Sequence, residues 1–320
     1  MEPPQTLYKQ SATHFALPLY LRKETEVNGR LIADLAEMFL STLLFPGTQL
    51  TGLWTKRAGM RAKLNMGEFT SSRWKAAQKK ILNNEYAVVD IQAQTPDFPN
   101  QKIWFTAHVN PIDRDEFLTS GMWKVACSVS YLRHIAASPE RVEALLQLVR
   151  SAWNGTPGGP AYGYGNLAMT LARPIFNPLQ EPPAPFPPPD VKLPTERVHA
   201  VPIAYVGNDI EGNLEASYVR DRGIKGAFWA NFLSAPYVAM AGGEAILRTK
   251  LNGMRVESLH HGGLLIVATD SPLPEDTEDT RERFWRLDEA LQPAFLAREQ
   301  MSETMRGTLG YFYRERPALR

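Results

Sequence analysis

Hydrophobic and polar residues alternate in three consecutive stretches of the first half of the chain, residues 86–94, 101–109 and 122–130. Strict alternation predicts strands with one buried face and one wetter face, as in an antiparallel sheet. The apolar stretch at residues 15–21 predicts a further strand. The residues that share the buried faces are Ala87, Val89, Ile91 and Ala93, then Ile103, Phe105, Ala107 and Val109, then Trp123, Val125, Cys127 and Val129.

A helical period of apolar residues marks four other segments. Their starts are Asn28, Thr70 or Ser71, Ser138-Pro139, and Thr280. Polar side chains of this kind accept hydrogen bonds from the free N–H groups of a first helical turn, and proline fits the first helical position. The inward-facing residues are Ile32, Leu35, Ala36, Phe39 and Leu43, then Trp74, Ala77, Ile81 and Leu82, then Val142, Leu145, Leu146 and Val149, then Phe284, Trp285, Leu287, Ala290 and Leu291.

Residues 223–269 form a densely apolar stretch that is divided by glycines. The spacing of its first aromatic residues, at 228–233, predicts a short helix. Ser234 predicts the cap of a second helix that ends at Gly242-Gly243, and a third helix ends at Asn252-Gly253. Two strand-like runs around Gly262-Gly263 predict a hairpin. The second run, Leu264 to Ala268, is apolar throughout and predicts a central strand that is covered on both faces.

The clearest boundary is the proline-rich segment 173–194, which favours an extended connector rather than a helix or a central strand. It divides the chain into an N-terminal half, 1–172, and a C-terminal half, 195–320. The predicted fold class is α+β, with mostly antiparallel sheets flanked by helices and two halves joined by the connector. We expect one sheet in each half, packed as a single unit.

One order of features in the second half resembles a known family. Trp229 and Phe232-Leu233-Ser234 precede Gly242-Gly243, a short strand and the run Gly-Leu-Leu-Ile-Val, and an acidic loop with prolines precedes a helix that ends in Leu-Gln-Pro. Over roughly residues 195–300 this order resembles the type VI secretion immunity family. The resemblance implies a non-enzymatic antitoxin whose partner is the toxin domain of a cognate effector, in several cases a nuclease.

Composition limits the compartment and the classes of partner that we expect. The 320 residues carry a net charge of +1, which gives no overall attraction to nucleic acid or membrane. The single cysteine, Cys127, excludes an internal disulfide, and the first residues lack the pattern of a secretory signal. We therefore expect a cytoplasmic protein with no nucleic-acid or membrane partner. A cytoplasmic antitoxin implies a toxin that acts in the cytoplasm. A homodimer is left open.

Common catalytic and metal-binding motifs are missing together. The six histidines include no HExxH pattern, and adjacent His260-His261 would point to opposite sides of a strand. The loop acids Asp113, Asp115 and Glu116 lack the spacing of a calcium loop, and the glycine-rich run at 158–165 fits neither nucleotide-binding pattern. We therefore predict no catalytic residue, no cofactor and no metal.

The acidic loop of the second half is the candidate for binding the toxin. A nuclease presents a basic channel for phosphates, and acidic side chains can occupy such a channel. The predicted contact residues are Glu275, Asp276, Glu278 and Asp279, with Asp209 and Glu211 as neighbours. An alternative contact is the basic segment 56–80, facing the carboxylates of the toxin. Alternative functions are a small-molecule binder or enzyme that uses a cleft near Tyr162, Tyr164 and His260, and a nucleic-acid-binding protein that uses the basic segment.

Overall fold

The computed structural model describes residues 12–22, 25, 27–57, 65–96, 98–108, 122–169, 223–224, 227–274 and 277–295. The strands are β1 (Ala12–Tyr20), β2 (Gln49–Arg57), β3 (Tyr86–Thr95), β4 (Phe98–His108), β5 (Met122–Ser128), β6 (Tyr162–Met169), β7 (Ala230–Leu233), β8 (Arg255–Ser258) and β9 (Leu264–Val267). The helices are α1 (Gly29–Thr42), α2 (Ser71–Leu82), α3 (Val129–Ala136), α4 (Pro139–Gly155), α7 (Ala235–Met240), α8 (Glu244–Lys250) and α9 (Glu278–Leu291), with short 3-10 helices η1 (His260–Gly262) and η2 (Gln292–Ala294).

The described strands form a single antiparallel sheet in the order β2-β3-β4-β5-β1-β6-β7-β9-β8. The two halves of the sequence meet where β6 pairs with β7, from Tyr162 opposite Leu233 to Gly165 opposite Ala230. The predicted α+β class with antiparallel strands is confirmed, but the expectation of two sheets is wrong. A shared sheet leaves fewer exposed strand edges than two separate sheets would. The connector at 173–194 lies outside the described residues, so the proposed boundaries stay predictions.

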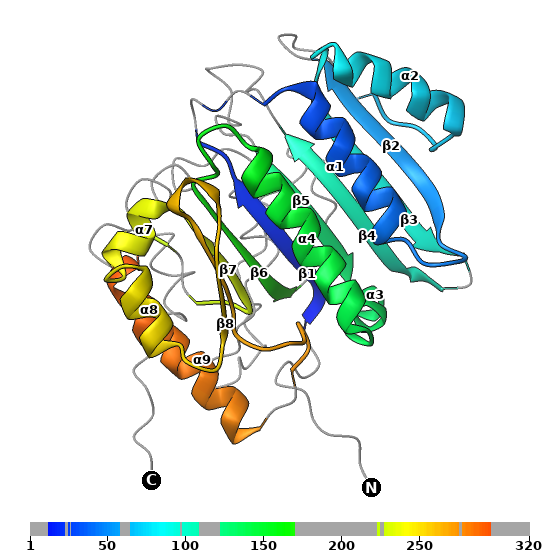
Figure 1. Cartoon of the computed structure of the whole chain (residues 1–320). Coiled ribbons are helices and arrows are strands. Elements are labelled where there is room, and N and C mark those ends of the chain that lie inside the picture. The colour runs from blue at the N-terminus through cyan, green and yellow to red at the C-terminus, as the bar shows by residue number, and fades with distance from the viewer. Residues whose placement is uncertain are drawn as a thin grey trace, which may run out of the picture.

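Helices cover both faces of this sheet (Figure 1). Successive residues of a strand point to opposite faces. In β9, Leu265 and Val267 pack in a cluster with residues of α1 to α4, whereas Leu264 and Ile266 pack in a second cluster with residues of α7, α8 and α9. The first four helices therefore lie over one face, and the last three lie over the opposite face near the β7–β9–β8 end.

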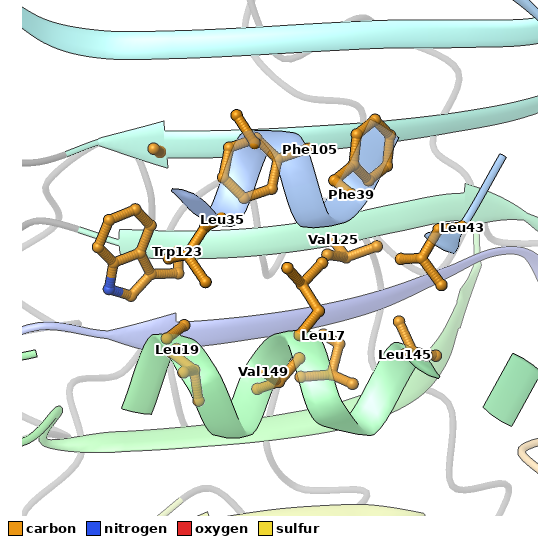
Figure 2. Packing of buried hydrophobic residues seen from close by; sticks show 14 of the residues in the cluster. Leu17, Leu19, Leu35, Phe39, Leu43, Phe105, Trp123, Val125, Leu145 and Val149 are labelled. Atoms are coloured by element: carbon orange, nitrogen blue, oxygen red, sulfur yellow. The ribbon is translucent and has the colours of Figure 1, made fainter. Parts of the chain in front are cut away.

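The larger core lies between α1, α4 and the middle strands (Figure 2). Leu35 and Phe39 of α1 and Val149 of α4 point toward Phe105 and Val125 of the sheet, and all are buried. The rings of Phe39 and Phe105 lie 5.7 Å apart. The starts of these helices are the predicted ones, because the side chains of Asn28 and Ser138 accept hydrogen bonds from Leu31 and Arg141. The cap of α2 is Thr70, also as predicted.

The structure corrects the predicted helix at 228–233, because Ala230–Leu233 form strand β7. Both faces of β7 are buried, so an apolar run of this length suits a strand as well as a helix. The Phe232 ring stacks with Trp153 on one side of the sheet, and Leu233 belongs to the core on the other side. The side chain of buried Asn231 holds the bend before the strand, accepting from Phe228 N at 3.0 Å and donating to its carbonyl at 2.7 Å.

Of the other helix and strand predictions, some are confirmed and some are wrong. The hairpin of β8 and β9 and the burial of β9 on both faces are confirmed, with η1 at the turn. Gly242, Gly243 and Gly253 have the positive φ angles expected after a helix end. Thr280 was the wrong cap for α9, since Thr277 accepts a hydrogen bond from Thr280 N. Leu82, predicted to face inward, is 47% exposed because it closes the last turn of α2.

Candidate partner-binding surface

The acidic residues that the structure describes at this site lie in the first turn of α9. Glu278 and Asp279 follow the Thr277 cap and are exposed. Carboxylates are favourable there because the free N–H groups give a helix start a partial positive charge. Asp279 pairs with Arg283 at 2.8 Å, and the same guanidinium donates to the carbonyl of Gly253 at 2.8 Å. Arg283 thus links the acidic turn to the turn that follows α8.

The other predicted contact residues, Glu275, Asp276, Asp209 and Glu211, lie outside the described residues. Glu278 and Asp279 are therefore the described part of the predicted site. The helix behind them is firmly anchored, because Phe284, Leu287 and Leu291 are buried in the second core.

Helices α7 and α8, which are joined at Gly242-Gly243, carry exposed apolar side chains. Met240 at the end of α7 is 43% exposed, and Ile246 in α8 is 47% exposed. On the inner sides of the same helices Val238 and Leu247 are buried. The sequence pattern alone did not separate Ile246 from its buried neighbour Leu247, since both are large and aliphatic.

A closed ring of four charged side chains joins α4 of the first half to β8 of the second half. Arg150 pairs with Glu143 and, at 2.8 Å, with Glu257, while Arg255 pairs with Glu257 and, at 2.7 Å, with Glu143. The hydrogen bond from Arg255, reinforced by that from Arg150, lowers the pKa of Glu143 to about 2. The ring secures the edge strand to the helix layer, and nothing in the sequence spacing indicated it.

The edge strand β8 is also covered by α8. Arg248 donates to the carbonyl of Val256 at 2.7 Å and to the Ser258 hydroxyl at 3.0 Å. Glu244 accepts from that hydroxyl at 2.8 Å, and this bond, followed by the one from Arg248, lowers the pKa of Glu244. An edge whose carbonyl is already engaged is a poor template for pairing with a further strand.

The basic segment of the first half is exposed at the other end of the sheet. Lys75 and Lys79 lie one turn apart on the outer side of α2 and are exposed. Lys80 lies over the ring of Tyr86, 5.8 Å from its centre. Part of the predicted segment, residues 58–64, lies outside the described residues.

The side chains of the alternative cleft do not share a surface. Tyr162 and Tyr164 are each 1% exposed and pack with Tyr20 in the second core. His260 is exposed in η1, and its carbonyl accepts a hydrogen bond from the Trp153 indole at 3.2 Å. The structure therefore does not bring these three side chains together as a binding site. The loop acids Asp113, Asp115 and Glu116 lie outside the described residues.

A buried polar row crosses the middle of the sheet. Asp90, Thr106 and Lys124 are opposite one another on β3, β4 and β5, and the Thr106 hydroxyl donates to Asp90 at 2.7 Å. Burial raises the pKa of Asp90 to about 6, against the effects of Thr106 and Lys124, and burial lowers the pKa of Lys124 to about 8. Asp90 is 1% exposed and Lys124 is 4% exposed. A substrate has no access to groups so deeply enclosed.

The described residues contain neither a metal-binding cluster nor a membrane-spanning helix. Among those residues, no group of three or more His, Cys, Asp and Glu side chains is arranged to hold a metal ion. Across the same residues, every helix is too short or too polar to cross a membrane.

The fold is similar to that of a solved Pseudomonas aeruginosa T6SS protein, PA0821. The superposition has a TM-score of 0.55 and covers 91% of this chain and 78% of that chain, at 12% sequence identity. At so low a sequence identity, the superposition shows a shared fold and nothing more. No curated protein sequence matches the chain.

A family model matches part of the second half of the chain. Residues 188–312 match the family model TsiV, described as type VI immunity for VRR-NUC. This match confirms the predicted type VI immunity family over those residues, and it extends a little beyond the stretch that carried the resemblance. The described part of the matched region comprises β7 to β9 and the helices α7, α8 and α9.

Proposed function

We propose that this protein is a cytoplasmic, non-enzymatic immunity protein that binds the nuclease domain of a cognate type VI effector and blocks its active site or substrate path. The observation that carries the proposal is the match of residues 188–312 to a family described as type VI immunity for VRR-NUC. The expected partner is therefore a VRR-NUC toxin domain, bound one to one. An interface of standard size would bury about 1,600 Å² in total.

Charge supports a particular mode of inhibition. A nuclease that binds a phosphate backbone needs a basic surface. Residues 270–295 hold eight acidic and three basic side chains, and the described acids Glu278 and Asp279 stand exposed at a helix start. We propose that this acidic turn, with Glu275 and Asp276 before it and Asp209 and Glu211 as neighbours, faces the DNA-binding surface of the toxin. Opposite charge would speed association and fix orientation.

The test uses the full chain and the purified nuclease domain. Calorimetry should give a one-to-one complex with a nanomolar dissociation constant, and the bound nuclease should no longer cleave DNA. Absence of binding at micromolar concentrations would overturn the proposal.

Charge reversal then tests the acidic turn. We expect Glu278→Lys with Asp279→Lys to slow association at least about tenfold at low salt and to lessen its salt dependence. The matched control is Lys75→Glu with Lys79→Glu at the other end of the sheet, which should leave association unchanged. A larger loss from the control pair would favour the alternative contact through the basic segment.

A further inference from the structure

Four large hydrophobic side chains are strongly exposed in the part of the chain that the structure describes. Two lie near each end of the sheet. Met66 precedes α2 and is 60% exposed, Leu82 is the last residue of α2 and is 47% exposed, and Met240 and Ile246 lie on α7 and α8. Single exposed apolar residues are common, but two on consecutive helices around one short turn are a candidate anchor for a partner.

The α7–α8 apolar patch consists of the exposed residues Pro236, Ala239, Met240, Ala245 and Ile246. It surrounds the turn at Gly242-Gly243, where both glycines have positive φ angles. Ile246 folds over this turn, because a side-chain carbon added at Gly242 would lie 3.3 Å from it. Buried residues on the inner side of each helix pack into the core. The exposed patch is therefore held on helices that are already in place before a partner binds.

This patch and the acidic turn of α9 lie on the same group of helices. Helix α8 packs against α9, α7 packs against η2 after α9, and Arg283 of α9 donates to the carbonyl of Gly253 in the turn that follows α8. Figure 1 shows α7, α8 and α9 at the same end of the molecule. This group of helices therefore carries an apolar patch around the α7–α8 turn, the exposed basic residues Arg248 and Lys250 on α8, and the carboxylates Glu278 and Asp279 at the start of α9.

The surface near Met66 and Leu82 carries positive charge. Between Met66 and Leu82 lie Lys75 and Lys79, which are exposed and make no ion pair with the described part of the chain. A basic toxin surface would be repelled there and attracted at the α9 end. Charge thus distinguishes two surfaces that are similar in apolar content.

We propose that the α7–α8 apolar patch is the anchor on which the effector's nuclease domain docks, with the acidic turn of α9 as part of the rim. The inference rests on the proposed function and adds the centre of its interface. Its partner surface carries an apolar or aromatic side chain surrounded by lysine and arginine. Methionine is enriched in interface cores, and a few central residues hold most of the binding energy.

The experiment compares two double variants of the full chain by calorimetry with the nuclease domain. Met240→Glu with Ile246→Glu places charge in the centre of the patch and should weaken the dissociation constant at least about 30-fold. Met66→Glu with Leu82→Glu makes the same change of chemistry at the α2 end and should leave it within about threefold of wild type. Circular dichroism and the melting temperature check that both variants are folded.

Two results would overturn the anchor while leaving the proposed function intact. One is wild-type affinity for the Met240 and Ile246 variant, and the other is an equal loss from the Met66 and Leu82 variant. If the glutamate variant does not fold, Met240→Ala with Ile246→Ala replaces it, with an expected weakening of about tenfold. Failure of the wild-type chain to bind would overturn the proposed function, and the anchor with it.

Discussion

The two ends of the sheet are built from similar parts and stabilised differently. At the β2 end, α1 and α2 meet by close packing, and Gly29 of α1 touches the carbonyl of Ile81 in α2. At the β8 end, the edge strand is bound by the ring of Glu143, Arg150, Arg255 and Glu257 and by Arg248. The β2 end is basic on its outer side and the β8 end carries the acidic helix. The two ends therefore differ in charge although both expose large apolar side chains.

The largest effect on stability is expected at the packed end. In Gly29→Ala the new methyl group would overlap the carbonyl oxygen of Ile81, which cannot move without its helix. We expect a loss of about 3 kcal/mol in the free energy of unfolding. Urea denaturation measures it. Gly52→Ala is the control, because its nearest neighbours would be 3.5 Å away, and a comparable loss there would contradict the packing argument.

The buried row in the same region gives a pH dependence. The pKa of Asp90 is about 6 when folded, against 3.8 as the unperturbed value, so the folded chain binds more protons between these pH values. Stability due to Asp90 is therefore highest below pH 4 and declines as the pH rises toward 6, by roughly 3 kcal/mol. Asp90→Asn should remove this dependence. The free energy of unfolding of both chains is measured at pH 4 and at pH 7. A difference between wild type and Asp90→Asn that is the same at both pH values would contradict the prediction.

The ionic end should show smaller, salt-sensitive coupling. A double-mutant cycle of Glu143→Gln and Arg255→Gln is expected to give about 1 kcal/mol at low salt and less at high salt. Because the folded pKa of Glu143 is lowered to about 2, its contribution is present above pH 4.5 and disappears as the pH falls toward 2. The control is the exposed pair Arg30 and Asp34 near the other end, 3.0 Å apart. Equal coupling energies in the two ion pairs would contradict the expected difference between them.

The smallest effects concern the helix caps, where the two ends should behave alike. Asn28→Ala and Thr277→Ala each remove a side chain that accepts from a helix N–H, and each should lower the unfolding free energy by about 1 kcal/mol. Ser234 occupies the cap position of α7 without such a bond, so Ser234→Ala should change the stability less. Thermal melts of the three variants compare them directly.

Local signals explain what the sequence could predict of the fold. Caps such as Asn28 and Thr70 involve neighbours within one element, and the structure confirms them. The alternation in β3, β4 and β5 predicted strands correctly, but the face expected to be wetter is buried at Asp90, Thr106 and Lys124. The pairing of β6 with β7 joins residues about seventy positions apart, and no local pattern specifies it. The run at 228–233 was misassigned because its burial on both faces hides the period of two that marks a strand.

The candidate site likewise has one part that the sequence could predict and another that it could not. The acidic loop was visible as a run of charge, and its described residues Glu278 and Asp279 are exposed at a helix start. The exposure of Met240 and Ile246 depends on which sides of α7 and α8 the core covers, and six- and seven-residue helices carry too few turns to reveal that side. The charged ring depends on how β8 lies against α4, which no local pattern specifies.

The buried cysteine has a practical consequence for studying the two ends. Cys127 is the chain's only thiol, it is 1% exposed, and burial raises its pKa well above the usual range. A thiol that stays protonated and enclosed does not react with maleimides in the folded state. A cysteine introduced at Met240 or at Leu82 would therefore be the single reactive position. The native background thus permits a fluorophore at either end without first removing a core residue.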